Sequence, residues 1–169
     1  GAVNSDGTAR ALTMSATGAN SSVVFNHAIG STAALASLNT SGSEIVLNGP
    51  TVNTTGNQTY AGVVRLASNT TLTGANVATT QGSEVVGAGN SVGIVGNASL
   101  GGVVSNVSQF SVSGTTQLAG NVSSAGNQTY TGAITLGGGS ALLASGANAV
   151  ITTGGAINSD GTTQASLTL

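Results

Sequence analysis

Two internal repeats restrict the folds open to this chain. Gly56–Tyr60 (Gly-Asn-Gln-Thr-Tyr) recurs as Gly126–Tyr130, and both copies are followed by a hydrophobic pair and a Leu. The segment 1–8 (Gly-Ala-Val-Asn-Ser-Asp-Gly-Thr) recurs as 155–162 with one Val-to-Ile change. The offsets from 56 to 126 and from 1 to 155 are close to three units of about 23 and seven units of about 22, the length of one solenoid coil. The repeats therefore predict about seven stacked coils of roughly 22 residues.

The local pattern agrees with short strands joined by tight corners. Segments of three to six residues rich in Val, Ile, Leu and Thr alternate with Asn-Gly, Asp-Gly, Ser-Gly and Gly-Asn pairs. We expect inward side chains such as Val64 to form ladders through a narrow core with little room for aromatic rings. Ser31–Leu38 is the one segment that also suits a short helix, although a strand-turn-strand fits it as well.

The composition excludes several classes of protein. Only 2 Lys and Arg and 4 Asp and Glu occur in 169 residues, so there is no basic surface for nucleic acid. With 0 Cys, the chain has no disulfide framework and no thiolate metal site. Its apolar runs are short and interrupted by Gly, Ser or Asn, so we expect no membrane insertion. Side chains that stack on copies of themselves tolerate few like charges, which makes the low charge typical of a long solenoid.

We expect one domain, because no charged or Pro-rich linker divides the chain. Residues 1–169 are predicted to form a single continuous β-solenoid, with 1–154 approximating one long repeat and 155–169 starting the next copy. Residue 1 is Gly, so the chain is expected to be a fragment or a processed product. Any export signal would then lie outside it.

Three strings resemble repeats of a known family: "GNQTYAGVVRLASNTTLTG", "TAALASLNTSGSEIVLNG" and "GAVNSDGTARALTM". They are similar to repeats of filamentous-haemagglutinin-like exoproteins and autotransporter-type adhesins, which are giant secreted bacterial surface proteins. The resemblance covers most of the chain. It implies an all-β, right-handed parallel β-helix, an extracellular or cell-surface location, and a role in adhesion or in an extracellular matrix, filament or biofilm. It assigns no catalytic residue.

The sequence offers little chemistry for catalysis or metal binding. Asp6 and Asp160 are equivalent copies in Asn-Ser-Asp-Gly, which is a turn signal. Glu44 and Glu84 occur in similar Gly-Ser-Glu phrases and are expected at solvated strand edges, and His27 is a single imidazole without a partner set. We therefore expect no enzyme, no cofactor and no metal site.

The repeats also single out structural positions. Tyr60 and Tyr130 are equivalent, and stacking or capping of a coil is favoured over an outward platform for sugars. Asn57 and Asn127 are equivalent as well, and both lie in Asn-x-Thr sequons, as do several other Asn residues. A Thr-x-Thr at Thr71–Thr73 is typical of ice-binding solenoids but does not recur in every coil.

The sequence favours a structural role over recognition. We predict a repeat module of an extracellular bacterial fibre or adhesin stalk, whose partners are copies of itself end to end or the continuing repeats of a giant chain. The alternatives are an adhesin module that binds glycans or proteins of a host or neighbouring cell, a donor-strand-exchange or amyloid-like filament subunit, and, remotely, a polysaccharide-degrading β-helix enzyme. Ligand, organism and secretion route stay open.

Overall fold

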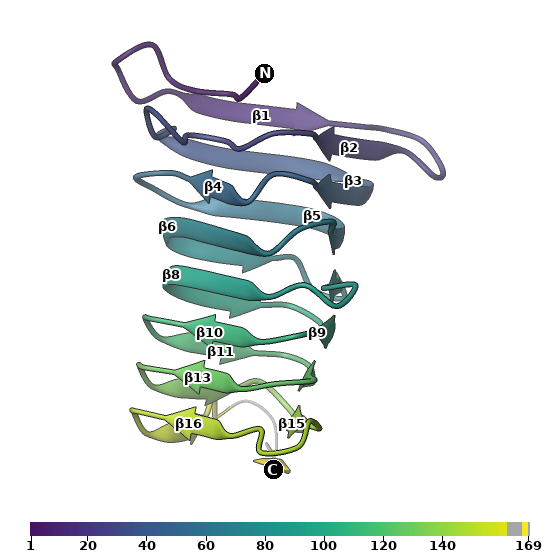
Figure 1. Ribbon diagram of the computed structural model, residues 1–169, viewed down its shortest axis with the longest axis vertical. Coiled ribbons are helices and arrows are strands. Elements are labelled where there is room, and N and C mark those ends of the chain that lie inside the picture. Colours follow the sequence, from purple (N-terminus) through teal and green to yellow (C-terminus); the bar gives the residue numbers. More distant parts are fainter. Residues whose placement is uncertain (162–166, 169) are drawn as a thin grey trace.

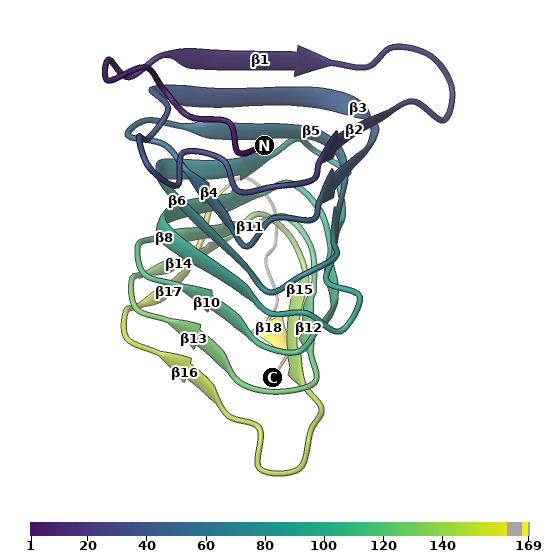
Figure 2. The same ribbon diagram turned by 45° about the horizontal axis from the view of Figure 1, so that its top comes forward.

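The chain winds around a single axis as a stack of parallel strands. The structure, a computed structural model, describes residues 1–161 and 167–168, and in these residues it contains strands but no helix. Seen from the amino-terminal end, the chain turns clockwise as it recedes from the viewer (Figure 2), which makes the coil right-handed. This agrees with the predicted right-handed parallel β-helix.

Three faces make up each turn, and we name them A, B and C in the order in which the chain visits them from Ala11 onward (Figure 1). Face A contains β1 (Ala11–Ser15), the first half of β3 (Ser37–Leu47) and of β5 (Gln58–Leu66), the second half of β6 (Thr70–Thr79) and of β8 (Val92–Leu100), β11 (Thr116–Leu118), β14 (Ile134–Leu136) and β17 (Ile157–Ser159). Face B contains β2 (Ser22–Phe25), the second halves of β3 and β5, β7 (Val85–Val86), β9 (Val104–Val107), β12 (Val122–Ser124), β15 (Ser140–Ala144) and β18 (Leu167–Thr168). Face C contains β4 (Thr51–Asn53), the first halves of β6 and β8, β10 (Phe110–Val112), β13 (Gln128–Tyr130) and β16 (Ile151–Thr153).

The predicted number of turns is confirmed. Following the register along face C, Val3 reaches Thr153 after seven turns, by way of Ile29, Val52, Leu72, Ile94, Val112 and Tyr130. The helix considered for Ser31–Leu38 does not form. Leu35 instead makes an isolated bridge to Thr54, and Ser37 begins β3, because the main chain there must pair with the next turn.

The turns differ in length. In the middle of the stack Val92 pairs with Phe110, and Thr116 pairs with Ile134 at the same interval in the numbering. Towards the ends of the stack the number of residues between register partners is larger, as shown by the pairs Ala11–Ser37 and Ser140–Leu167. The strands hardly change in number between turns, so the extra residues lie in the corners.

Inward side chains form columns along the axis. The column of face B is apolar in every turn, and its members, all 8% exposed or less, are Val23, Ile45, Val64, Val85, Val104, Val122 and Leu142. Val64 itself is 2% exposed, which confirms that it faces the core. Each turn covers the apolar face of its neighbours, so stability is shared between successive turns.

The expectation that the core leaves little room for rings is wrong. All four aromatic residues are inside, namely Phe25, Tyr60, Phe110 and Tyr130. The register explains how they fit: Tyr60 lies between Thr40 and Thr79 of the adjacent turns, so small neighbours above and below leave space for one ring. Phe110 and Tyr130 also contact each other, with ring centroids 5.8 Å apart and planes tilted by 50°.

Glycines stack at the corner between faces C and A. A Cβ at Gly96 would lie 1.8 Å from the Gly74 carbonyl oxygen, and one at Gly114 would lie 2.6 Å from the Gly96 oxygen. The same column includes Gly56, Gly74, Gly96, Gly114, Gly132 and Gly155. Successive turns approach too closely at this corner for a Cβ, so the stack requires Gly at these positions.

Candidate functional site

The first Gly-Asn-Gln-Thr-Tyr segment forms a hydrogen-bonded corner. The Gln58 side-chain amide, fully buried, donates to the Val52 carbonyl oxygen at 3.1 Å and to the Thr73 carbonyl oxygen at 2.7 Å. The Tyr60 hydroxyl donates to Gln58 Oε1 at 2.8 Å. Thr73 belongs to the next turn, so one buried amide fixes the corner of its own turn and ties it to the following one. We call this arrangement the Gln–Tyr corner.

The second copy repeats the same bonds on another face. Gln128 donates to the Val122 carbonyl oxygen at 3.2 Å and to that of Leu143 at 2.8 Å, and the Tyr130 hydroxyl donates to Gln128 Oε1 at 2.9 Å. In both copies the two carbonyl acceptors have the same sequence separation from the Gln, with one acceptor before the Gln and one after it. The bonds therefore depend on corner geometry and not on which face follows the corner.

The two Gln–Tyr corners are not separated by whole turns, so the sequence-based interpretation of the offsets is wrong on this point. Three turns bring Gln58 of face A to Thr116, and Gln128 lies two faces further, on face C. Likewise Val3 lies on face C, whereas its repeat counterpart Ile157 lies on face A. Because the turns lengthen from the centre of the stack to its ends, an average coil length is a poor guide to register.

Burial sets the acidity of the two tyrosines. It raises the pKa of the Tyr60 and Tyr130 hydroxyls well above their ordinary value of 10.0, because the phenolate would lose its hydration inside the stack. Both are inward, so neither is an outward platform for sugar rings. The favoured interpretation, stacking within the coil, fits their positions.

Four asparagines that lie immediately before the first inward residue of a strand segment bind the next turn through their side chains. In each case Oδ1 accepts the main-chain N–H at the equivalent position one turn later, at 2.8–3.0 Å: Asn69 from Ser91, Asn97 from Thr115, Asn121 from Ala141 and Asn127 from Val150. These four bonds occur at corners leading into all three faces. Asn57, the counterpart of Asn127, accepts the Leu38 N–H through its main-chain oxygen at 3.0 Å.

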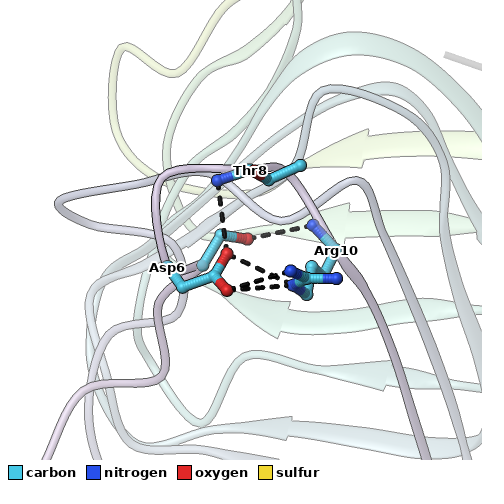
Figure 3. A network of polar contacts seen from close by, with 4 residues as sticks. Asp6, Thr8 and Arg10 are labelled. Carbon is cyan, nitrogen blue, oxygen red and sulfur yellow. Dashed lines mark hydrogen bonds and ion pairs between the residues drawn. The ribbon is translucent and has the colours of Figure 1, made fainter.

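Asp6 forms the predicted turn at the amino-terminal end (Figure 3). Its Oδ1 accepts the Thr8 N–H at 3.3 Å, Gly7 has a φ of 101°, and Arg10 Nη2 approaches Oδ2 at 3.0 Å. The Arg10 guanidinium, followed by the Thr8 N–H, lowers the pKa of the Asp6 carboxyl. Asp160 occupies the matching turn at the other end, where Gly161 has a φ of 76°.

The remaining described charges lie on face B. Arg65 forms an ion pair with Glu44 of the preceding turn, and Glu84 accepts a hydrogen bond from Ser105 Oγ of the following turn at 2.6 Å. Both acids bridge adjacent turns from partly exposed positions, close to the solvated strand edges that were predicted. Within the described residues, the strands of faces A and C carry no charged side chain.

Two hollows follow the corner between faces A and B. They measure about 270 Å³ and about 510 Å³, and stacked small residues such as Gly101, Ala119 and Gly137 line both. Asp160 lines the first hollow and Glu84 lines the second, so neither hollow is lined by two of the described acids. Over residues 1–161 and 167–168, no group of three His, Cys, Asp or Glu side chains lies in position to hold a metal. His27 is exposed at a bend.

Outward hydroxyls line up along face C. The column of register partners reads Thr51, Thr71, Gly93, Ser111, Thr129 and Thr152. Gly93 interrupts it, and Val95, 50% exposed, interrupts the neighbouring column that contains Thr73. The Thr-x-Thr pattern is thus extended by Ser and Thr of other turns without occurring in every turn.

A shorter motif would have located the corners more directly than the two long repeats. Gly-x-x-x-Leu occurs at equal intervals in the numbering at Gly96–Leu100, Gly114–Leu118 and Gly132–Leu136, and outside this series at Gly62–Leu66, Gly138–Leu142 and Gly139–Leu143. In the structure the three segments of the series are stacked on face A, with the Gly at the corner and the Leu in the core. The spacing of the glycines is the length of a central turn.

Comparison with known protein families, with curated proteins and with solved structures gave no match. No helix capable of crossing a membrane is found in the described part of the chain.

Proposed function

We propose that this chain is a structural repeat module, a length of rod in an extracellular bacterial fibre or adhesin stalk that is extended by further turns of the same kind. One observation carries the proposal: the sequence of Gly1–Thr8, at one end of the stack, recurs as Gly155–Thr162, of which Gly155–Gly161 lie at the other end. A module with equivalent ends can be continued without a change of cross-section.

The side-chain bonds between turns support this role. Gln–Tyr corners, corner asparagines and the Arg65–Glu44 ion pair all join one turn to the next. Two faces with uncharged strands would allow long stacks without repeated like charges at about 4.8 Å spacing. The extracellular location and the bacterial source rest on the resemblance to exoprotein and autotransporter repeats.

Electron microscopy of a lengthened chain tests the proposal. The continuation begins at Ser15, because Leu167-Thr168-Leu169 corresponds to Leu12-Thr13-Met14 once one residue is skipped. A chain of residues 1–169 followed by 15–169 should form a single rod longer by about 34 Å, seven turns at ~4.8 Å each. Two separate particles on a tether would overturn the proposal.

A second candidate is a binding module for a neutral glycan, favoured by the uncharged hydroxyl column of face C. A hollow of about 320 Å³ lies beside it, lined by residues that include Asn69, Ser111 and Thr129. Binding to an array of neutral polysaccharides, and its loss in a Ser111→Val, Thr129→Val double variant, would support this role. Unchanged binding in that variant, or no binding by the wild type, would contradict it.

A further inference from the structure

The segment 1–8 and its second copy present the same strand edge, which residues 28–32 cover in the first copy and which no described strand covers in the second. At the amino-terminal end, Val3 donates its N–H to the Ala28 carbonyl oxygen at 3.2 Å and accepts the Gly30 N–H at 2.7 Å. The Asn4 side chain adds a third bond, with Oδ1 accepting the Thr32 N–H at 3.0 Å. Residues 28–32 of the following turn are therefore the natural cover of the segment 1–8.

The second copy presents the same groups in the same orientation. On the side facing β14, the Ala156 carbonyl oxygen accepts the Ile134 N–H at 2.9 Å and the Asp160 N–H donates to Leu136 at 2.9 Å. Main-chain groups of a parallel strand alternate between its two neighbours, so the N–H and C=O of Ile157 point away from β14, as those of Val3 point towards Ala28 and Gly30. Of the strands that the structure describes, β14 alone pairs with β17, since β18 pairs with β15.

The side chains of this edge also match. Ile157 replaces Val3 at the pairing position, and Asn158 repeats Asn4 and is exposed at the edge. An open parallel edge leaves strand hydrogen bonds unmade and half-covers its apolar column. Ile157 accordingly packs only partly buried against the core.

We propose that the open edge at Ile157 and Asn158 is the docking site for residues 28–32 of a second copy of this unit, continuous in the same polypeptide. The inference rests on the proposed function and identifies the pairing that continues the rod. A separate molecule is the weaker occupant, because residues 1–8 already cover its segment 28–32. Because Val3 lies on face C and Ile157 on face A, the second copy would present each of its faces on a different side of the rod.

Residue-resolved hydrogen exchange of the single chain and of the lengthened chain (1–169 followed by 15–169) tests this pairing. The Ile157 amide should exchange freely in the single chain and slow to the rate of the Val3 amide in the lengthened one. A lengthened rod in which the Ile157 amide still exchanges freely overturns the inference and leaves the proposed function standing. Protection of Ile157 in the single chain at high concentration, with dimers in solution, would assign the site to a separate molecule and also overturn it.

A matched pair of variants provides a second measurement. Asn158→Ala should leave the urea midpoint of the single chain unchanged and should lower that of the lengthened chain as much as Asn4→Ala does, because only there does Asn158 cap a following turn. Equal effects of Asn158→Ala in the two chains would contradict the inference.

Discussion

The central turns and the end turns of this rod contain the same kinds of strand and inward residue, but they differ in length and in how deeply those residues are buried. Between Val92 and Leu136 the turns are short, their corners contain stacked Gly, and their inward residues are almost fully buried. In the longer first turn, Leu12 and Met14 pack only partly buried on the core. An inward residue needs a turn on both sides, so position in the stack decides its contribution as much as its identity.

The largest effect is expected from a charge placed in a central column. Val64→Asp buries an unpaired carboxylate between Ile45 and Val85 and should lower the free energy of unfolding by at least ~3 kcal/mol. Urea denaturation followed by circular dichroism measures the loss. Val95→Asp is the control, since Val95 is 50% exposed on face C. Similar losses in the two variants would mean that the inward and outward assignments do not govern stability.

Two isoleucines that are register partners allow the stability contribution of a central turn to be compared directly with that of the last turn. Ile134 is 0% exposed, whereas Ile157, which pairs with it, is only partly buried. Ile134→Ala should cost about 2–5 kcal/mol of unfolding free energy, the usual range for a buried site. Ile157→Ala should cost less than half of that, because its cavity opens at the edge. Equal losses in urea denaturation would contradict the idea that the last turn is half-covered.

Alkaline pH should weaken the interior. The unfolded chain ionises its tyrosines above pH 10, while burial keeps Tyr60 and Tyr130 protonated in the fold because their pKa values are raised. The unfolded state then binds fewer protons, so stability falls as pH rises above 10, by about 1.4 kcal/mol per pH unit for each tyrosine. The Tyr60→Phe, Tyr130→Phe variant should be less stable at pH 7 and should show a flatter decline above pH 10. An unchanged slope would place the titrating groups elsewhere.

The smallest effect concerns the corner asparagines. Asn97→Ala removes the side-chain acceptor of the Thr115 N–H in a central turn and should cost about 1 kcal/mol of unfolding free energy. Asn4→Ala removes the side-chain acceptor of the Thr32 N–H in the first turn and should cost less, because that turn is already exposed to water. Calorimetric melting of the two variants measures the difference. A larger loss for Asn4→Ala would reverse the comparison between centre and end.

Contacts between residues of different turns could not be predicted from the sequence, whereas the inward direction of some side chains could be expected. The expectation that Val64 faces inward is confirmed by its 2% exposure, which fixes a strand register that the sequence pattern left open by one residue. The ion pair between Arg65 and Glu44 was not predictable, because the register shifts between Ser41 and Glu44 where β3 bends from face A to face B. A corner can absorb residues without changing the strands beside it, so sequence separation does not give the partner.

The two long repeats illustrate the same division. The sequence by itself determined that the chain would stack parallel strands around a thin apolar core. Its β-branched segments favour strands, its corner glycines allow tight turns, and its few charges avoid like-charge contacts between stacked strands. Only the tertiary structure decided which face each copy occupies: Gln58 starts a strand of face A and Gln128 one of face C, with the same hydrogen bonds. The physical reason is that hydrogen bonds within a corner are local, whereas the face reached depends on the lengths of all the corners passed before it.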